Sequence, residues 1–117
     1  MQRASELEIY KTAYVLTREI HKVRTKMPRS LKYDVGEEMM KSSLTVIRLI
    51  IQSSRESSKD TFLKELLTEC EILWSWLRLS YDLKGASTGE FRLLSERLDD
   101  LSRQAASWMK WSKNKKK

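Results

Sequence analysis

The sequence contains only one cysteine, one proline, three glycines and one histidine among its 117 residues. A single cysteine excludes an internal disulfide and a cysteine-rich zinc site. So few glycines and prolines disfavour a fold with many strands, because each hairpin needs a turn. No run of about 18 uncharged apolar residues is present, so we expect no membrane span. The N-terminal residues have no apolar signal-peptide segment, which predicts a cytoplasmic protein.

The residue types that carry most enzyme chemistry are equally scarce. His21 is the only histidine. A di-iron bundle needs a glutamate three residues before each histidine ligand, and here that position is Arg18. Cys70 lies among apolar residues at helical spacing, which favours a buried, inert thiol over a nucleophile. The glycines match no phosphate-binding loop. We therefore predict no catalytic residue, no metal site and no cofactor.

Apolar residues recur at alternating steps of three and four through most of the chain. Four such stripes begin at Ile9, Val35, Leu63 and Phe91. The pattern predicts helices over residues 5–27, 34–53, 58–84 and 88–112. Because the connections are short, neighbouring helices should run antiparallel, so the sequence predicts an all-α, up-down-up-down four-helix bundle over residues 1–112. Residues 113–117 are expected to form a disordered basic tail.

Capping signals stand near the start of every predicted helix. A side-chain oxygen followed three residues later by an acid can satisfy free backbone N–H groups reciprocally. The candidate pairs are Ser5–Glu8, Asp34–Glu37, Ser57–Asp60 and Ser87–Glu90. Gly85 is expected to end the third helix in the left-handed conformation.

Two of the predicted helices carry a second apolar line beside the one that faces the core. Such a line is either the margin of a wide core arc or a surface that meets another subunit, and the sequence leaves both interpretations open. The second interpretation predicts an oligomer. Its candidate interface residues are Leu44, Ile47 and Ile51 in 34–53, and Trp76, Leu79 and Leu83 in 58–84.

Basic residues outnumber acidic ones by 23 to 16, which gives a net charge of +7 and favours a polyanionic partner. They form rows on three of the predicted helices, and no acidic residue follows Asp100. One row is usually a solvated face, whereas three rows on a basic chain favour a surface that contacts phosphates. The candidate nucleic-acid- or partner-binding residues are Lys11, Arg18, Lys22, Lys26, Arg29, Lys32, Lys41, Arg48, Arg55, Arg78, Arg103, Lys110 and Lys113.

Two positions allow a structural and a functional interpretation. Arg78 can pair with Asp82 one helical turn later, or it can bind a phosphate or a partner carboxylate. Trp111 lies between Lys110 and Lys113, where it can pack against the end of the bundle or stack on a base. Packing is the favoured interpretation for Trp111.

A series of short motifs runs through the chain in a characteristic order and spacing. They are Tyr10 after a short N-terminal arm, Met27-Pro28-Arg29, Tyr33-Asp34-Val35-Gly36, Trp76-Leu77-Arg78-Leu79, Tyr81-Asp82-Leu83, and Trp108 before a basic tail. Over about residues 7 to 113 the chain resembles the Avd (accessory variability determinant) proteins of diversity-generating retroelements. Avd resembles in turn the four-helix-bundle proteins encoded in ribosomal-RNA intervening sequences. One departure is the stretch Arg103–Ser107, where the family has a glycine-containing stretch before the last tryptophan.

The resemblance implies a bacterial, archaeal or phage-encoded protein that assembles as a ring-like homopentamer with a basic surface. It implies binding to the retroelement's reverse transcriptase and to nucleic acid, chiefly the template-containing RNA, with DNA as a further candidate. Such a protein supports error-prone copying and does no chemistry itself. Arg29 and Arg78 match arginines of the family's motifs and are carried over as binding candidates. The alternative is an intervening-sequence-type bundle that acts as a protein–protein scaffold without a reverse transcriptase.

Overall fold

The structure, a computed structural model, describes residues 3–115 of the chain. Its long helices are α1 (Glu8–Thr25), α3 (Val35–Arg55), α4 (Asp60–Asp82) and α5 (Thr88–Lys115), and its short elements are η1 (Ala4–Glu6) and α2 (Arg29–Lys32). No strand occurs between residues 3 and 115. The prediction of an all-α chain with four long helices is confirmed.

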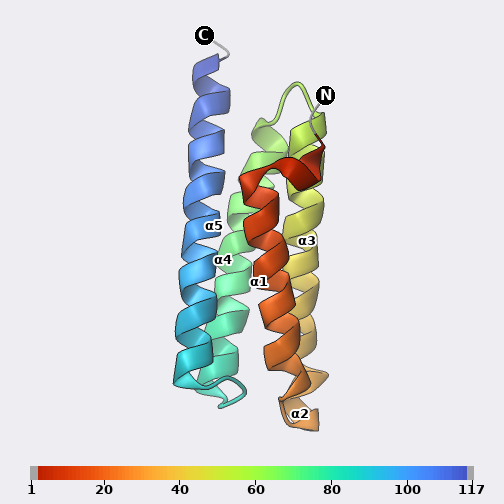
Figure 1. Ribbon diagram of the computed structural model, residues 1–117, viewed down its shortest axis with the longest axis vertical. Coiled ribbons are helices and arrows are strands. Elements are labelled where there is room, and N and C mark those ends of the chain that lie inside the picture. Colours follow the sequence, from red (N-terminus) through yellow and green to blue (C-terminus); the bar gives the residue numbers. More distant parts are fainter. Residues whose placement is uncertain (1–2, 116–117) are drawn as a thin grey trace.

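The long helices lie side by side along a body of 49 × 22 × 20 Å (Figure 1). In Figure 1, α1 leads away from the end that holds the N-terminus, α3 returns to it, and α4 and α5 repeat the same course. The main contacts join α1 to α3 and α5, and join α4 to the same two helices. The four helices therefore enclose one core. Within the described part of the chain, no helix combines the length and the apolar character that a membrane crossing needs.

The core is built from the apolar stripes that the sequence pattern picks out. In α1 the residues at these positions, from Ile9 to Val23, are all buried, and Met27 just beyond the helix is buried as well. Tyr81 and Phe91, at the edges of the stripes of α4 and α5, are partly buried and stack with their ring centroids 4.6 Å apart. Because the stripes are four to five turns long, their burial is enough to fix which face of each helix points inward.

Of the predicted caps, only the one before α5 forms as expected. The backbone N–H of Glu90 donates to Ser87 Oγ (3.1 Å), and the backbone N–H of Ser87 donates to Glu90 Oε1 (2.8 Å). The predicted caps Ser5 and Ser57 are wrong, because Leu7 and Lys59 precede α1 and α4, without a side-chain cap. Asp34 does precede α3, but its side chain makes no cap hydrogen bond.

The predicted 28–33 connection contains the short helix α2, which folds the chain tightly against the start of α3. A Cβ atom on Gly36 would lie 2.9 Å from Met27 Sδ and 3.2 Å from the Leu31 carbonyl oxygen, so only glycine fits there without a shift. The prediction that Gly85 ends this helix in the left-handed conformation is wrong, because the residue with positive φ after α4 is Lys84 (φ 65°). Gly85 instead packs closely, since a Cβ there would lie 3.2 Å from Leu31 Cδ1.

The C-terminal helix is longer than the sequence pattern predicts. Helix α5 continues to Lys115, so residues 113–115 are helical and not a disordered tail. Residues 116–117 of that predicted tail lie outside the described residues. In Figure 1 the end of α5 extends past the other helices.

Candidate nucleic-acid and partner interface

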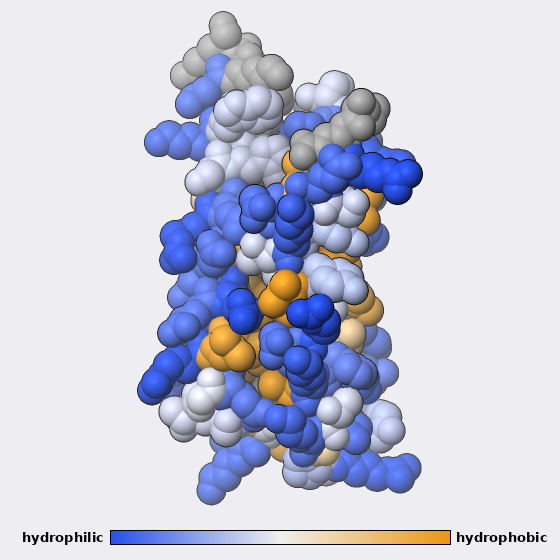
Figure 2. Space-filling model, viewed as in Figure 1, coloured by the Kyte–Doolittle hydropathy of each residue, from blue (hydrophilic) through white to orange (hydrophobic). Residues whose placement is uncertain are grey.

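Hydrophilic side chains cover most of the face shown in Figure 2, with patches of apolar surface between them. The structure divides the candidate basic residues into two groups by their ion pairs. One group pairs with a nearby acid of the same chain: Lys11 with Glu8 (3.7 Å), Lys22 with Glu19 (3.5 Å), Lys26 with Glu90 (3.2 Å), Lys41 with Glu38 (3.9 Å), Arg78 with Asp82 (3.2 Å) and Arg103 with Asp100 (3.9 Å). Exposed pairs of this kind contribute little to stability, yet each places a negative charge beside the cation.

The second group forms no ion pair with any residue between 3 and 115. It consists of Arg18, Arg29, Lys32, Arg48, Arg55, Lys110 and Lys113. Arg48 donates from Nη1 to Gln52 Oε1 (2.8 Å), and the Arg18 guanidinium lies 5.9 Å from the centre of the Tyr14 ring. These contacts leave the positive charges unopposed, so this group is the stronger candidate for binding an anion.

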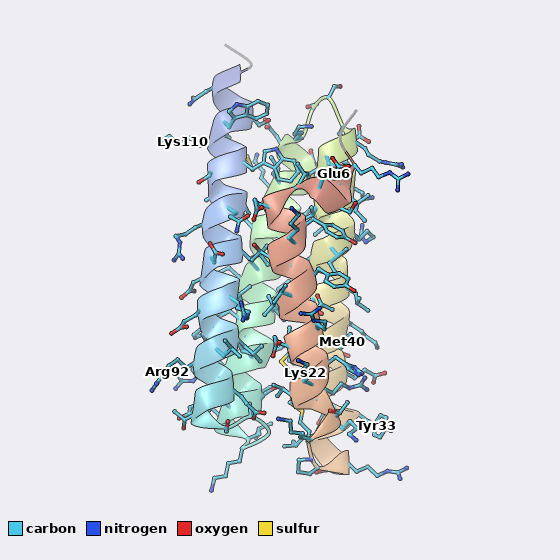
Figure 3. The ribbon with its side chains drawn as sticks, in the orientation of Figure 1. Glu6, Lys22, Tyr33, Met40, Arg92 and Lys110 are labelled. Atoms are coloured by element: carbon cyan, nitrogen blue, oxygen red, sulfur yellow. The ribbon has the colours of Figure 1, made fainter. Side chains whose placement is uncertain are left out.

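The basic residues do not merge into one patch. Arg29 and Lys32 lie on α2 at one end of the molecule, whereas Lys110 and Lys113 lie near the C-terminal end of α5 at the opposite end (Figure 1). Figure 3 shows Lys22 on the viewer's side of α1 and Arg92 on the outer side of α5. An extended ligand would have to pass over several helices to touch all three rows.

One basic cluster is not evident from the sequence pattern. The guanidinium carbons of Arg24 and Arg29 lie 5.7 Å and 5.8 Å from the centre of the Tyr33 ring, within the range of cation–π attraction. Tyr33 is 62% exposed. Arg24 and Tyr33 are nine residues apart, with a helix end and the Pro28 turn between them, so helical periodicity could not bring them together. The only available signal was the abundance of bases around Pro28.

The second apolar lines turn out to be partly core margin and partly exposed surface. Ile47 and Trp76 are partly buried and pack against the core, as the core-margin interpretation expects. Leu44 (51% exposed), Leu79 (39%) and Leu83 remain exposed. Ile51 is partly buried, and with Tyr10 of α1 it lines a cavity of about 460 Å³.

The two lines lie on different sides of α3. The line on α3 lies on the α1 side of that helix, since Ile51 and Tyr10 of α1 line the same cavity. The line on α4 has the same helical spacing as Glu69. The Glu69 carboxylate accepts a hydrogen bond from the buried Ser42 Oγ of α3 (2.5 Å), so this line lies beside the α3–α4 border. At about 100° per residue, the α3 row of Lys41, Arg48 and Arg55 lies between the two apolar lines.

A comparison with protein families settles what kind of chain has this architecture. A family model described as bAvd-like matches residues 8–112. The chain belongs to the bAvd-like family. The matched region begins with α1 and reaches the last turn of α5, and it confirms the resemblance to Avd. Avd-like proteins are accessory, non-catalytic proteins. The comparison with curated proteins gives no match.

The structure also places the other side chains of this bAvd-like chain that the sequence singles out. Cys70 is buried, and burial raises the pKa of its thiol to about 11, so the thiol stays protonated and unreactive at neutral pH. Among the described residues, no group of three His, Cys, Asp or Glu side chains could hold a metal ion. His21 is exposed on α1. Trp111 is 52% exposed, so about half of its surface is covered within the chain.

Proposed function

We propose that this bAvd-like chain is a non-enzymatic accessory protein of a diversity-generating retroelement. It binds the reverse transcriptase and the template-containing RNA, and it thereby supports mutagenic reverse transcription. The family match over residues 8–112 carries this proposal. The net charge of +7 and the cations without an ion pair support the RNA-binding part of it.

RNA binding would depend on many weak phosphate contacts. One subunit presents unpaired cations at both ends and on the outer side of α3, and each contributes a modest electrostatic attraction. Assembly of several subunits raises the effective concentration of these cations along one RNA strand. An oligomer therefore binds the same strand more tightly than one subunit does.

The placement of the apolar lines supports self-association. One line lies on the α1 side of α3, and the other lies on α4. The α3 line of one subunit can therefore meet the α4 line of the next. Contacts between unlike surfaces are heterologous, and they close into a ring when the rotation allows. The homopentamer that the resemblance implies is such a ring.

The RNA-binding part is tested with two double variants that lose equal charge. Arg48→Gln/Arg55→Gln removes cations without an ion pair, whereas Lys22→Gln/Lys41→Gln removes cations that pair with Glu19 and Glu38. We measure the affinity for single-stranded RNA against salt concentration by fluorescence anisotropy. The first variant should flatten the log–log slope by about 0.7 per lost contact, and the second by less. A wild-type slope near zero would refute electrostatic binding.

The assembly part is tested by particle mass in light scattering. Leu44→Glu and Leu79→Glu place a charge in the proposed interface, so each should dissociate the particle while helical circular dichroism is retained. Leu93→Glu is the matched control, because Leu93 on α5 has nearly the same exposure as Leu79 (38% against 39%) but lies outside both apolar lines. If wild type is a monomer at micromolar concentration, the assembly proposal fails.

The partner part is tested by co-purification with a reverse transcriptase encoded beside the gene for this chain. Specific co-purification supports the accessory role. A chain that assembles but binds neither RNA nor the enzyme would be the intervening-sequence-type scaffold instead.

A further inference from the structure

We propose that Arg24, Arg29 and Tyr33 form a clamp that stacks one unpaired nucleobase and holds the neighbouring phosphate of the same strand. The inference rests on the proposed RNA binding and adds where, and by which chemistry, a single-stranded segment is held. None of the sequence motifs assigns a role to Arg24 or Tyr33.

The clamp consists of three planar groups gathered at the α2 end of the molecule. Both guanidinium groups lie within 6 Å of the centre of the Tyr33 ring. In Figure 3 the Tyr33 side chain points away from the helices, and 62% of its surface is exposed. Unpaired bases in RNA are commonly stacked on aromatic rings and on arginine planes. A base that enters here can stack on the exposed ring or on an arginine plane of this cluster.

The surrounding backbone holds the clamp in place before a ligand binds. Arg24 Nε donates to the carbonyl oxygen of Lys32 (3.0 Å), which ties the end of α1 to α2. The stem of the same arginine packs against Gly36, since a Cβ at that position would lie 3.1 Å from Arg24 Cγ. A site that is already ordered loses less conformational entropy on binding. The nitrogens at the far end of the Arg24 guanidinium remain available for a phosphate.

The charge around the clamp also fits a phosphate. Within residues 3–115, neither arginine pairs with an acid, and the adjacent carboxylate of Asp34 lies beyond ion-pair distance of both. Lys32 adds a further cation without an ion pair. An acidic peptide would use the arginines but leave the exposed ring unused. A single-stranded nucleic acid uses both, because it has a base and a phosphate in every nucleotide.

The test uses short single-stranded oligonucleotides that contain 2-aminopurine, whose emission is quenched by stacking. Binding to the wild-type chain should quench this emission. Tyr33→Leu should abolish the quenching and weaken binding about tenfold, as expected for the loss of one base–aromatic stack. Tyr33→Phe keeps the ring and should retain both signals. Circular dichroism melting of each variant shows whether the bundle itself is intact.

The control variant is Trp111→Leu, which removes the exposed tryptophan near the opposite end of the molecule. It should leave the quenching unchanged. If Trp111→Leu abolishes the quenching and Tyr33→Leu does not, the base stacks at the other end and the clamp is refuted.

Other outcomes separate the clamp from the proposed function. If wild type binds the oligonucleotide with a normal salt slope and Tyr33→Leu changes neither affinity nor quenching, RNA binding stands and the clamp fails. If wild type binds no oligonucleotide at low salt, RNA binding itself fails. If Tyr33→Leu abolishes binding to the reverse transcriptase and leaves RNA binding unchanged, the cluster is a protein-binding site, and the proposal is overturned.

Discussion

The close packing around Gly36 is predicted to make Gly36→Ala destabilising, although Gly36 lies inside a helix. Alanine is the better helix former and would stabilise α3 by about 0.5–1 kcal/mol if space allowed. The added methyl group would lie 2.9 Å from Met27 Sδ and 3.2 Å from the Leu31 carbonyl oxygen. Overpacking of a buried site usually costs about 1–3 kcal/mol. The net loss in unfolding free energy should therefore be up to about 2.5 kcal/mol, centred on about 1 kcal/mol.

Gly89→Ala is the matched control for this substitution. Gly89 also lies in a helix, but no atom approaches within 4 Å of a Cβ placed there. That variant should be neutral or more stable by up to about 1 kcal/mol. Urea and thermal unfolding followed by circular dichroism measure both, and each kcal/mol corresponds to about 4 °C for a chain of this size. If Gly36→Ala is stabilised as much as Gly89→Ala, the tight junction between α1, α2 and α3 is refuted.

Three further results are expected from side chains in the described structure. Ser87→Ala should lower the unfolding free energy by about 0.5–2 kcal/mol, measured by urea denaturation, because it removes the cap of α5; an unchanged midpoint would contradict the cap. The backbone N–H of Ser87 and then Lys26 lower the pKa of the Glu90 carboxyl from its ordinary value of 4.5, so its contribution to stability is present above pH 4.5 and is lost as the pH falls through the lower folded-state pKa. Wild type should thus lose more stability than Glu90→Gln in thermal melts taken below pH 4.5, and parallel losses would disprove this linkage. Cys70 should resist Ellman's reagent in the native chain and react at once in denaturant, whereas rapid native labelling would show that the thiol is accessible.

The buried side of each helix could be predicted because it depends on repetition. Each stripe repeats its spacing over several turns, so one misplaced residue does not change the result. The stripe from Leu63 to Leu77, for example, is buried at every position. Helix ends depend on single contacts instead. Ser5 fails as a cap because the chain enters α1 through η1, with the N–H of Leu7 bonded to the carbonyl oxygen of Ala4 (3.0 Å).

The candidate interface was predictable only as a set of residue types. Net charge and row spacing indicated basic surfaces, but they could not show which cations have an acid beside them. Lys22 and Arg18 belong to one row of α1, yet only Lys22 pairs with Glu19. The cluster around Tyr33 depends on how α2 folds the chain back, and no periodic pattern encodes that turn.

Under the proposed RNA binding, the separation of the cations on α2 from those at the far end of α5 has a consequence for the length of strand that one chain can hold. Those on α2 and those at the far end of α5 are divided by most of a body 49 Å long. An oligonucleotide shorter than this distance can reach the α2 cations or the α5 cations but not both, whereas a longer one can reach both sets. Affinity should then increase in two stages as the oligonucleotide is lengthened. Long transcripts would bind more tightly than short fragments.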